Sequence, residues 1–449
     1  MDFPKLTLPL VCLHLVLATP AINCQAQQTD TQQTDANGFI PLFNGQDLKG
    51  WVNVNCAPNT WTVKEGVIHC TGKPIGELRT ERMYQNFVLE LEWRHLRPKG
   101  NAGVFVWADA LPARGQPFHR AIEVQVLDGR EADWYTSDGD IFPIHGATMI
   151  PKNGRGGSRA FPTEKRSKPS PAWNHYRIEC LDGSIKLSVN GKVVTEGSQC
   201  TPRKGYICLE SEGSPAEFRN IQLKELPATS VPPTQIAKPT EGFISLYNGV
   251  DLTGWKMHPG LVDHWKSNDW RLTYDGKATG KEKNLWTEES FGDFQLIVDW
   301  RWNGKYDATT QRPVILPSGQ HAKNEDGSEK QIDVPIADSG IYLRGTPKGQ
   351  INIWQWPIGS GEIWGYRTDS SQTDEVRAAA TPQVPADQPI GQWNRFLITL
   401  IGDRLSVELN GQQVINQCQL SGLPAEGPIA LQHHGDPIEF ANIFIKRLD

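Results

Sequence analysis

Hydrophobic and polar positions alternate with a period of two over many short stretches of this chain. In residues 87–93, for example, Leu89, Leu91 and Trp93 alternate with Glu90 and Glu92, so the two sets would face opposite sides of a strand. Similar runs occur at 102–107, 122–127, 176–179, 185–189 and 206–209, and again at 294–300, 340–343, 396–400 and 405–409. Asp-Gly and Asn-Gly pairs separate several of them. The pattern predicts an all-β protein and favours two-sheet sandwiches of jelly-roll type.

The chain contains the same series of motifs twice. The segment 38–51, GFIPLFNGQDLKGW, returns at 242–255 as GFISLYNGVDLTGW, and the later motifs follow in the same order. Each unit is long enough to form a domain with its own core. We therefore predict a first copy over 38–226, a proline-rich, semi-extended linker over 227–241, and a second copy over 242–449.

The first 37 residues have the composition of an export segment. Residues 1–26 combine an early lysine with a short apolar run and small residues, which predicts a signal peptide. Residues 27–37 are polar and predict a flexible leader. Because Asn23 precedes Cys24, the sequence argues against a lipoprotein anchor. The expected location is the periplasm or the outside of the cell, and no other apolar run is long enough to span a membrane.

Composition narrows the range of partners. A net charge of -6 gives no reason to expect nucleic acid. The 16 tryptophans suit both sandwich cores and sugar-stacking surfaces. Five of the cysteines lie in the first copy, where an exported protein would form disulfides, and Cys56 with Cys70 is the favoured pair. No cysteine or histidine spacing matches a known zinc motif, so no metal ligands are predicted.

The segment 122–128, IEVQVLD, carries the clearest candidate chemistry. Glu123 and Gln125 share one face of the predicted strand, and Asp128 would join them only through a β-bulge. This row resembles the acid motif of sandwich-fold glycan hydrolases with one carboxylate replaced by an amide. The alternative is an ordinary polar strand solvated on one side.

Several motifs together resemble one known family. The opening Phe-Asn-Gly-x-Asp-Leu-x-Gly-Trp, the Asn-Ala-Gly-Val or Asp-Ser-Gly-Ile strand, Glu-Val-Gln-Val-Leu-Asp, Trp-Asn, Asn-Gly and the closing Phe-Arg-Asn-Ile are similar to the 3-keto-disaccharide hydrolase domain family. The resemblance covers both copies, from residue 38 to 448. It implies two tandem concanavalin-A-like jelly rolls and an oligosaccharide or glycoside as substrate.

The resemblance also implies a reaction. A ketone at C3 of a sugar acidifies the C2 proton, so a base can remove it, expel the C1 substituent and leave an enone that water hydrates. The expected catalytic residues in the first copy are Glu123, Asp128 and His145. Gln125, Arg79 and His119 are expected to contact the substrate. No cofactor is required by the sequence, although a divalent cation is compatible with it.

The second copy departs from this pattern. Its matching segment, 350–355, reads QINIWQ, so both acids become amides. The residues expected to bind sugar in this copy are Asp338, Arg344, Trp354, Glu362 and Arg367. Glu362 would be the remaining candidate for acid–base chemistry. Two alternative functions stay open: a non-catalytic carbohydrate-binding protein and an ordinary glycosidase.

Overall fold

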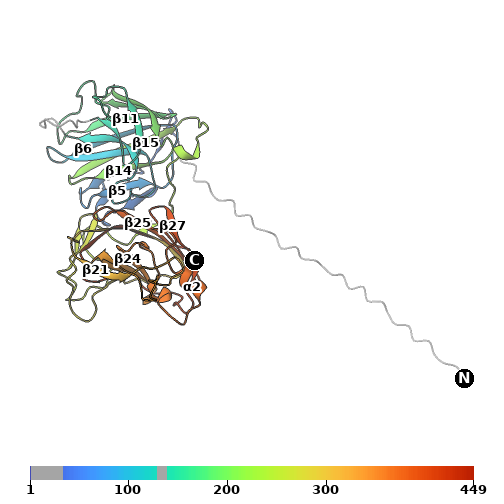
Figure 1. The fold of residues 1–449 in the computed structure, drawn as a ribbon. Coiled ribbons are helices and arrows are strands. Elements are labelled where there is room, and N and C mark those ends of the chain that lie inside the picture. The colour runs from blue at the N-terminus through green and yellow to red at the C-terminus, as the bar shows by residue number, and fades with distance from the viewer. Residues whose placement is uncertain (2–33, 129–138, 449) are drawn as a thin grey trace.

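The computed structural model describes residues 1, 34–128 and 139–448, so the predicted signal peptide and most of the leader lie outside the described residues. Two β-sandwiches follow one another along the chain (Figure 1). The predicted all-β class is confirmed. No helix in the described part of the chain is both long and apolar enough to cross a membrane.

The first copy consists of two antiparallel sheets. The outer sheet has the order β10–β13–β12–β11–β6–β15–β4–β3, and β1 pairs with β15. Its strands are β1 (Ile40–Pro41), β3 (Trp61–Lys64), β4 (Val67–Cys70), β6 (Phe87–His95), β10 (Thr148–Pro151), β11 (Asn174–Leu181), β12 (Ser184–Val189), β13 (Lys192–Thr201) and β15 (Ala216–Glu225). The inner sheet has the order β2–β5–β14–β7–β8–β9, with β2 (Trp51–Val54), β5 (Gly76–Thr80), β7 (Asn101–Ala108), β8 (Ala121–Leu127), β9 (Ile141–Ile144) and β14 (Tyr206–Ser211).

The second copy repeats this plan with a smaller inner sheet. Its outer sheet has the order β17–β18–β29–β20–β25–β26–β27, and β16 pairs with β29. These strands are β16 (Ile244–Ser245), β17 (Trp265–Asn268), β18 (Arg271–Tyr274), β20 (Phe294–Trp302), β25 (Asn394–Ile401), β26 (Arg404–Leu409), β27 (Gln412–Gln419) and β29 (Ile438–Arg447). Its inner sheet has the order β19–β28–β23–β24, with β19 (Leu285–Trp286), β23 (Asp338–Leu343), β24 (Thr346–Trp354) and β28 (Ala430–Leu431).

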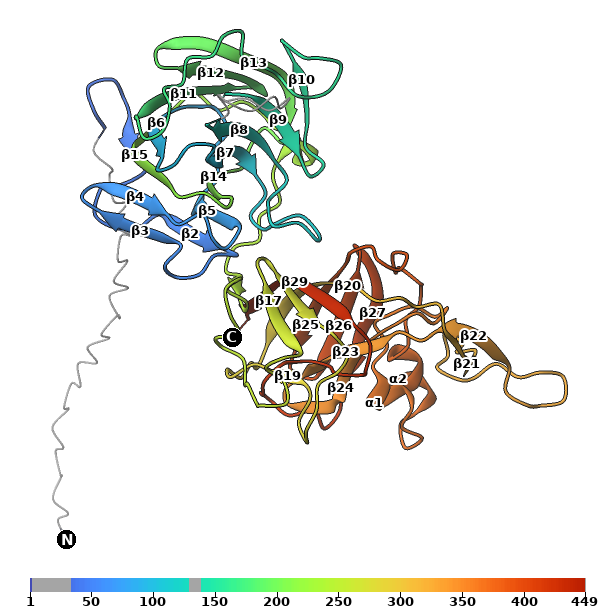
Figure 2. The ribbon, with the colours of Figure 1, turned by 90° about the vertical axis from the view of Figure 1, so that its left-hand side faces the viewer.

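Additions distinguish the second copy from the first. A hairpin of β21 (Thr309–Pro313) and β22 (Gln331–Pro335) projects from its body (Figure 2). Two short helices, α1 (Trp364–Arg367) and α2 (Asp374–Ala379), follow β24. Thr373 caps α2 through its side chain, and Asp374 and Glu375 in the first turn suit the positive end of the helix dipole.

Period-two alternation places one face of each inner sheet in the core. In β7 and β8 the core-facing residues are Ala102, Val104, Val106, Ile122, Val124 and Val126, all with 0% exposure. The intervening positions face away from this core, and there β8 carries Glu123 and Gln125. The inner sheet therefore presents polar side chains on the face opposite to the core, as its alternation predicts.

The linker follows the first copy closely before it reaches the second. It contains the short 3-10 helix η1 (Pro233–Gln235). The Ala237 amide donates to the Lys204 carbonyl at 2.7 Å, and the Lys238 amide donates to Asp109 Oδ1 at 2.8 Å. This segment is thus held by hydrogen bonds along its length.

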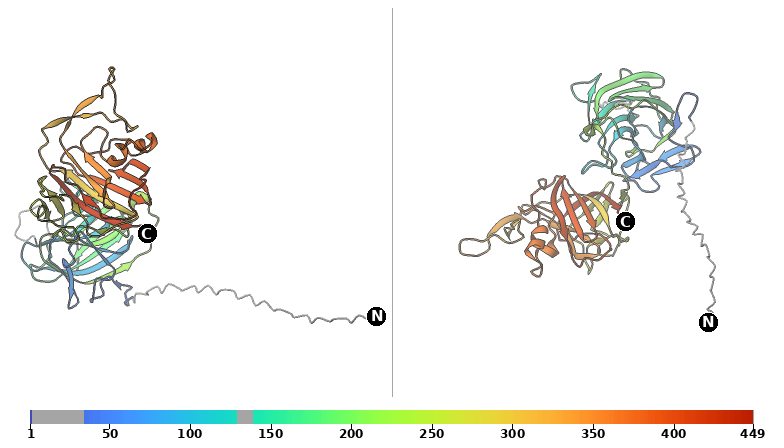
Figure 3. Two further views of the ribbon diagram at one scale, coloured as in Figure 1. Left: turned by 90° about the horizontal axis from the view of Figure 1, so that it is seen from below. Right: turned by 90° about the vertical axis from the view of Figure 1, so that its right-hand side faces the viewer.

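The two copies also contact one another directly (Figure 3). The buried carboxylate of Asp299 accepts hydrogen bonds from the Gly115 amide and from Asn442 Nδ2, each at 2.7 Å. Asn55 Nδ2 donates to Asn442 Oδ1 at 2.8 Å, and an apolar cluster that includes Val54 and Ile297 lies beside these bonds. A buried, fully paired carboxylate at the interface favours one fixed arrangement of the copies.

The thiols of the described residues are free and buried, including Cys56 and Cys70. The expected disulfide between these two is therefore wrong for this structure. Cys70 Sγ instead accepts a hydrogen bond from the Gly72 amide at 3.3 Å.

Candidate active site

The strand register of the first copy brings four glutamates together. Glu77 of β5 lies opposite Glu210 of β14, while Gly103 of β7 lies between β14 and β8, opposite Gln125. Glu123 precedes Gln125 by two residues and Glu212 follows Glu210 by two, so all project from the same face. We call Glu77, Glu123, Glu210 and Glu212 the carboxylate cluster.

Gly103 makes room for this cluster. A Cβ atom at this position would lie 2.7 Å from Glu210 Oε2 and 3.2 Å from Glu123 Oε1. Any side chain there would push the two carboxylates apart. The glycine of the Asn-Ala-Gly-Val motif is therefore needed here because only a residue without a side chain leaves room for both carboxylates.

The cluster opens into a cleft of about 240 Å³. Its lining residues are Asn101, Phe118, Glu123, Gln125, Leu127, Phe142, Arg159, Glu210 and Glu212. The cleft thus combines carboxyl and amide groups with the aromatic rings of Phe118 and Phe142. Such a mixture of apolar walls with a few convergent polar groups is typical of small-molecule sites.

A chain of hydrogen bonds orients the cleft side chains. Gln125 Nε2 donates to Asn101 Oδ1 at 2.8 Å and to the Ala102 carbonyl at 3.1 Å. Asn101 Nδ2 in turn donates to Glu212 Oε2. Gln125 and Glu212 are therefore held by a common partner.

Burial raises the pKa of three carboxyl groups in this cluster. Burial, followed by the charge of Glu212, raises the pKa of Glu123 well above its usual value. Burial, followed by the charge of Glu123, raises the pKa of Glu210 in the same way. Burial raises the pKa of Glu212 to about 7, against the opposing effect of its hydrogen bond from Asn101. Because like charges in a desolvated site cannot all ionise together, the cluster suits groups that hold and exchange protons near neutral pH.

Arg159 supplies the positive charge of the cleft. It comes from the irregular stretch between β10 and β11, lies with its guanidinium 3.3 Å from the centroid of Phe142, and pairs with the buried Asp140 at 3.1 Å. Its charge lowers the pKa of Glu123, against the larger effect of burial. This residue forms a wall of the cleft.

Asp128 does not join the cluster. The pairing of β7 with β8 runs from Asn101↔Leu127 to Val106↔Ile122 without a register shift, so the expected bulge is absent. Asp128 accepts a hydrogen bond from the Ser170 amide at 3.3 Å. The prediction that Asp128 shares a site with Glu123 is therefore wrong, because regular alternation turns it to the other face.

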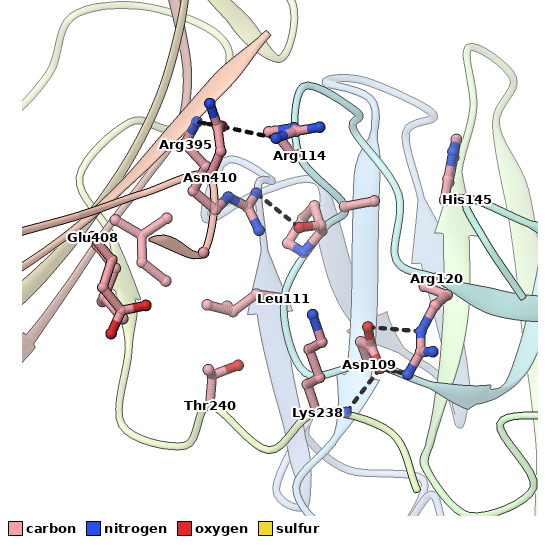
Figure 4. Close-up of a pocket in the computed structure, with 15 residues that line it drawn as sticks. Asp109, Leu111, Arg114, Arg120, His145, Lys238, Thr240, Arg395, Glu408 and Asn410 are labelled. Atoms are coloured by element: carbon pink, nitrogen blue, oxygen red, sulfur yellow. Dashed lines mark hydrogen bonds and ion pairs between the residues drawn. The ribbon is translucent and has the colours of Figure 1, made fainter. Parts of the chain in front are cut away.

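His145 lies in another hollow, at the boundary between the copies. This pocket of about 450 Å³ is lined by both copies and by the linker, and His145 lies at its edge near Arg120 (Figure 4). Three of the charged groups that line it are in ion pairs: Arg120 with Asp109 at 2.9 Å, and Arg395 with Asp299 at 2.6 Å. The structure does not bring His145 into the cleft of Glu123.

Arg79 and His119 lie beside the cleft without lining it. Arg79 stacks 4.1 Å from the ring centroid of Tyr206 and donates to the Thr80 carbonyl at 2.7 Å. His119 is completely buried against Glu77. Neither side chain is exposed to a substrate in the cleft, so their predicted substrate contacts are not supported by these positions.

The second copy carries amides where the first has acids. Gly340 occupies the position of Gly103, and a Cβ there would meet Gln432 Oε1 at 2.7 Å and Gln350 Nε2 at 2.9 Å. The registers match Gln350 with Glu123, Asn352 with Gln125 and Gln432 with Glu210. Gln350 Nε2 donates to Gln432 Oε1 at 2.9 Å. Amides can donate and accept, so this set satisfies itself without a shared proton.

Aromatic rings border the amides in a hollow of about 390 Å³. Trp354 and Trp356 stack with centroids 4.0 Å apart, and Trp364 also lines this hollow with 48% of its surface exposed. Asp338 lies on the same surface, where burial raises its pKa to about 6 and His434 at 3.6 Å opposes that effect. The structure thus brings Asp338 and Trp354 together, as predicted from the sequence. We call this surface the aromatic groove.

The other predicted residues of the second copy have structural partners. Glu362 is fully buried, accepts from Asn352 Nδ2 at 2.6 Å and pairs with Arg367. Arg344 donates to the Gly292 carbonyl, the Gly402 carbonyl and Asp293. None of the three lines the aromatic groove, so the structure does not place them at a binding surface.

Five residues of the cleft or the carboxylate cluster were not predicted from the sequence to belong to the site: Glu77, Asn101, Arg159, Glu210 and Glu212. The signal for two of them was present, since Glu210 and Glu212 alternate as Glu123 and Gln125 do. Only the order of the strands in the sheet shows that the two pairs are neighbours.

Comparison with known proteins finds the same family in both copies. The family model described as "3-keto-alpha-glucoside-1,2-lyase-like domain" matches residues 38–224 and 242–446. A 3-keto-disaccharide hydrolase of Bacteroides thetaiotaomicron is 21% identical over 288 residues, which cover 56% of this chain and 93% of the relative.

Solved structures show similarity over part of the chain. A Parabacteroides distasonis protein named as a glycosyl hydrolase is 22% identical with a TM-score of 0.35, covering 43% of this chain and 95% of that one. The carbohydrate-binding module CBM66 of Bacillus subtilis is 12% identical with a TM-score of 0.29, covering 39% of this chain and 96% of that one.

Proposed function

Because the chain belongs to the 3-keto-alpha-glucoside-1,2-lyase-like domain family, which is a glycan-active hydrolase family, we propose that its first copy cleaves 3-keto-glycosides. The observation that carries the proposal is the pairing of Glu123 with Glu212 in one cleft. Burial raises the pKa of both carboxyl groups, that of Glu212 to about 7. An elimination needs one group that accepts a proton and one that donates a proton, and carboxyl groups with raised pKa values can exchange protons near neutral pH.

In the proposed reaction the Glu212 carboxylate removes the C2 proton. The electron pair of the broken C–H bond forms a C2–C3 double bond and the C3 carbonyl becomes an enolate. When the C3 carbonyl re-forms, this pair makes the C1–C2 double bond, the C1–O bond breaks, and protonated Glu123 gives its proton to the departing oxygen. The Arg159 guanidinium stabilises the C3 oxygen while it carries negative charge. Water then adds at C1 and a proton returns to C2, so one water is consumed for each bond cleaved.

The decisive experiment uses a 3-keto-glucoside and its unoxidised parent as substrates of the purified chain. We expect release of the aglycone from the keto sugar alone. In D₂O the released 3-keto sugar should carry deuterium at C2, measured at early times against the product incubated without enzyme. Equal turnover of the unoxidised glycoside, or cleavage without deuterium at C2, would favour an ordinary glycosidase.

The aromatic groove supports a carbohydrate-binding function for the second copy. The aromatic groove combines stacked tryptophans with amides that are already hydrogen-bonded, and its Asp338 carboxyl group is paired with His434. Stacking faces and amides hold sugars without cleaving them. The second copy would then retain a glycan while the first acts on it. Titration of the Glu123→Gln chain with oligosaccharides tests this, since binding must persist there without turnover.

The proposal includes action outside the cytoplasm. Its support is the composition of residues 1–26, which predicts a signal peptide. Fractionation of cells that express the full chain tests it, because a protein retained with cytoplasmic markers at its unprocessed mass would contradict export.

A further inference from the structure

Three potential metal ligands meet at one end of the carboxylate cluster, and one of them is Glu77 of the cluster itself. A carboxylate oxygen of Glu77, a ring nitrogen of His119 and the sulfur of Cys208 all lie within 4.8 Å of one another. They come from β5, from the loop before β8 and from β14, and each has 0% exposure. Carboxylate, imidazole and thiolate are the ligand types of zinc sites.

The polar groups of this set are not all satisfied by the protein. The His119 amide donates to Glu77 Oε1 at 3.0 Å, and Nδ1 contacts Oε2 of the same carboxylate. His119 Nε2 has no hydrogen-bond partner among the described residues. A buried imidazole nitrogen without a partner is rare in folded proteins, and a bound ion would account for it.

The fold does not need these side chains, as the second copy shows. Glu77 precedes Leu78 as Asn284 precedes Leu285, and those leucines occupy the same place in the two sheets. By the same register, Ala430 takes the position of Cys208. An amide and a methyl group therefore fill this place in a sandwich of the same plan.

We propose that Glu77, His119 and Cys208 bind a divalent transition-metal ion of the zinc type. A borderline-soft ion suits a site with one sulfur, one nitrogen and one oxygen ligand, whereas Mg²⁺ and Ca²⁺ prefer oxygen alone. Cys208 loses its thiol proton to solvent on binding, and the two negative ligands then balance the charge of the ion.

The position of the site gives the ion a defined effect. His119 belongs to the loop 109–120, so the ion would fix this loop to β5 and β14. Phe118, the next residue, lines the cleft, and Gln116 accepts a hydrogen bond through its carbonyl from Asn442 of the second copy at 3.0 Å. One ion would thus order both a cleft wall and a contact between the copies. This proposal does not depend on the reaction.

The test uses the untagged full-length chain, loaded with Zn²⁺ and freed of excess metal by gel filtration. We expect about one zinc per chain by mass spectrometry, and much less in Cys208→Ala, which copies the second-copy residue. Cys418→Ala is the matched control, because Cys418 is also buried and free, and it should keep its zinc. Co²⁺ loading should give a thiolate-to-metal absorption band that Cys208→Ala lacks.

Thermal unfolding separates a metal effect from a folding defect. A chelator should lower the melting temperature of the wild-type chain and leave that of Cys208→Ala unchanged. A wild-type chain that binds no zinc, or full zinc content in both Cys208→Ala and His119→Gln, would overturn the proposal. The absorption band decides the case in which His119→Gln does not fold.

Discussion

The two copies carry different side chains at one row of equivalent strand positions. Gly103 and Gly340 lie at equivalent places, but the first is flanked by Glu123 and Glu210 and the second by Gln350 and Gln432. The amides donate and accept, so Gln350 Nε2 can donate to Gln432 Oε1 at 2.9 Å. Carboxylates only accept, so the same geometry forces protons onto them. The difference shows how one register can serve either binding or proton transfer.

The largest expected effect comes from making the first copy resemble the second. Glu123→Gln keeps the shape of the side chain and removes its proton, so turnover of a 3-keto-glucoside should fall by roughly 10²- to 10⁴-fold. Glu179→Gln, on the outer sheet, is the matched control and should keep wild-type activity. Unchanged turnover by Glu123→Gln would remove this residue from the mechanism and return attention to Glu362 of the second copy.

The reverse exchange should damage the second copy. Gln432→Glu places a carboxylate in a buried site, beside the Gln350 amide that now donates to Gln432 Oε1. We expect a loss of about 2–4 kcal/mol in the free energy of unfolding at pH 8, measured with denaturant. The loss should shrink toward pH 4, where the carboxyl group is protonated. Full stability at pH 8 would mean that the second copy can hold an acid cluster after all.

These exchanges depend on features that the sequence predicted only in part. The alternation around Glu123 and Gln125 predicted their common face, because period two follows directly from strand geometry. The prediction for Asp128 was wrong because it required a β-bulge, and β8 pairs with β7 without one. A single sequence gives no reliable sign of whether a bulge is present. Glu210 stands 87 positions after Glu123 along the chain, yet the strand order β14–β7–β8 brings it to the same glycine. Non-local pairing of this kind is not visible in local patterns.

The site residues of the second copy were also predicted only in part. Trp354 was predicted as a stacking platform of a sugar cleft, and the structure puts it in the aromatic groove. Arg344 and Glu362 were also predicted to bind sugar, but they have structural partners: Arg344 lies at a turn with positive φ, and Glu362 is in a buried pair with Arg367. A charged residue in a sandwich is as often a structural partner as a ligand, and only its contacts distinguish the two.

The carboxylate cluster should also affect how the stability of the folded chain depends on pH. The folded-state pKa of Glu123 is raised, so the folded chain holds its proton where the unfolded chain has lost it. Stability from this group is present below the unfolded value near 4.5 and is lost as pH rises toward the folded value. At pH 8 the melting temperature of Glu123→Gln should therefore be a few degrees higher than that of the wild-type chain. At pH 4 the two melting temperatures should be the same. A higher wild-type melting temperature at pH 8 would contradict the protonated state.

The smallest expected effect comes from a change in the aromatic groove. It tests whether the second copy binds the glycan while the first copy cleaves it. Trp356 stacks on Trp354 at 4.0 Å and lies near Arg312, whose guanidinium is 5.7 Å from its ring centroid. Removing one stacking face costs about 0.5–1.5 kcal/mol, so Trp356→Ala should weaken oligosaccharide binding by roughly 2- to 10-fold in calorimetric titrations. Turnover of a small 3-keto-glucoside should not change, because that substrate would occupy only the cleft of the first copy. Trp270→Ala, outside the groove, is the control, and an equal fall in small-substrate turnover would show that the two copies do not act separately.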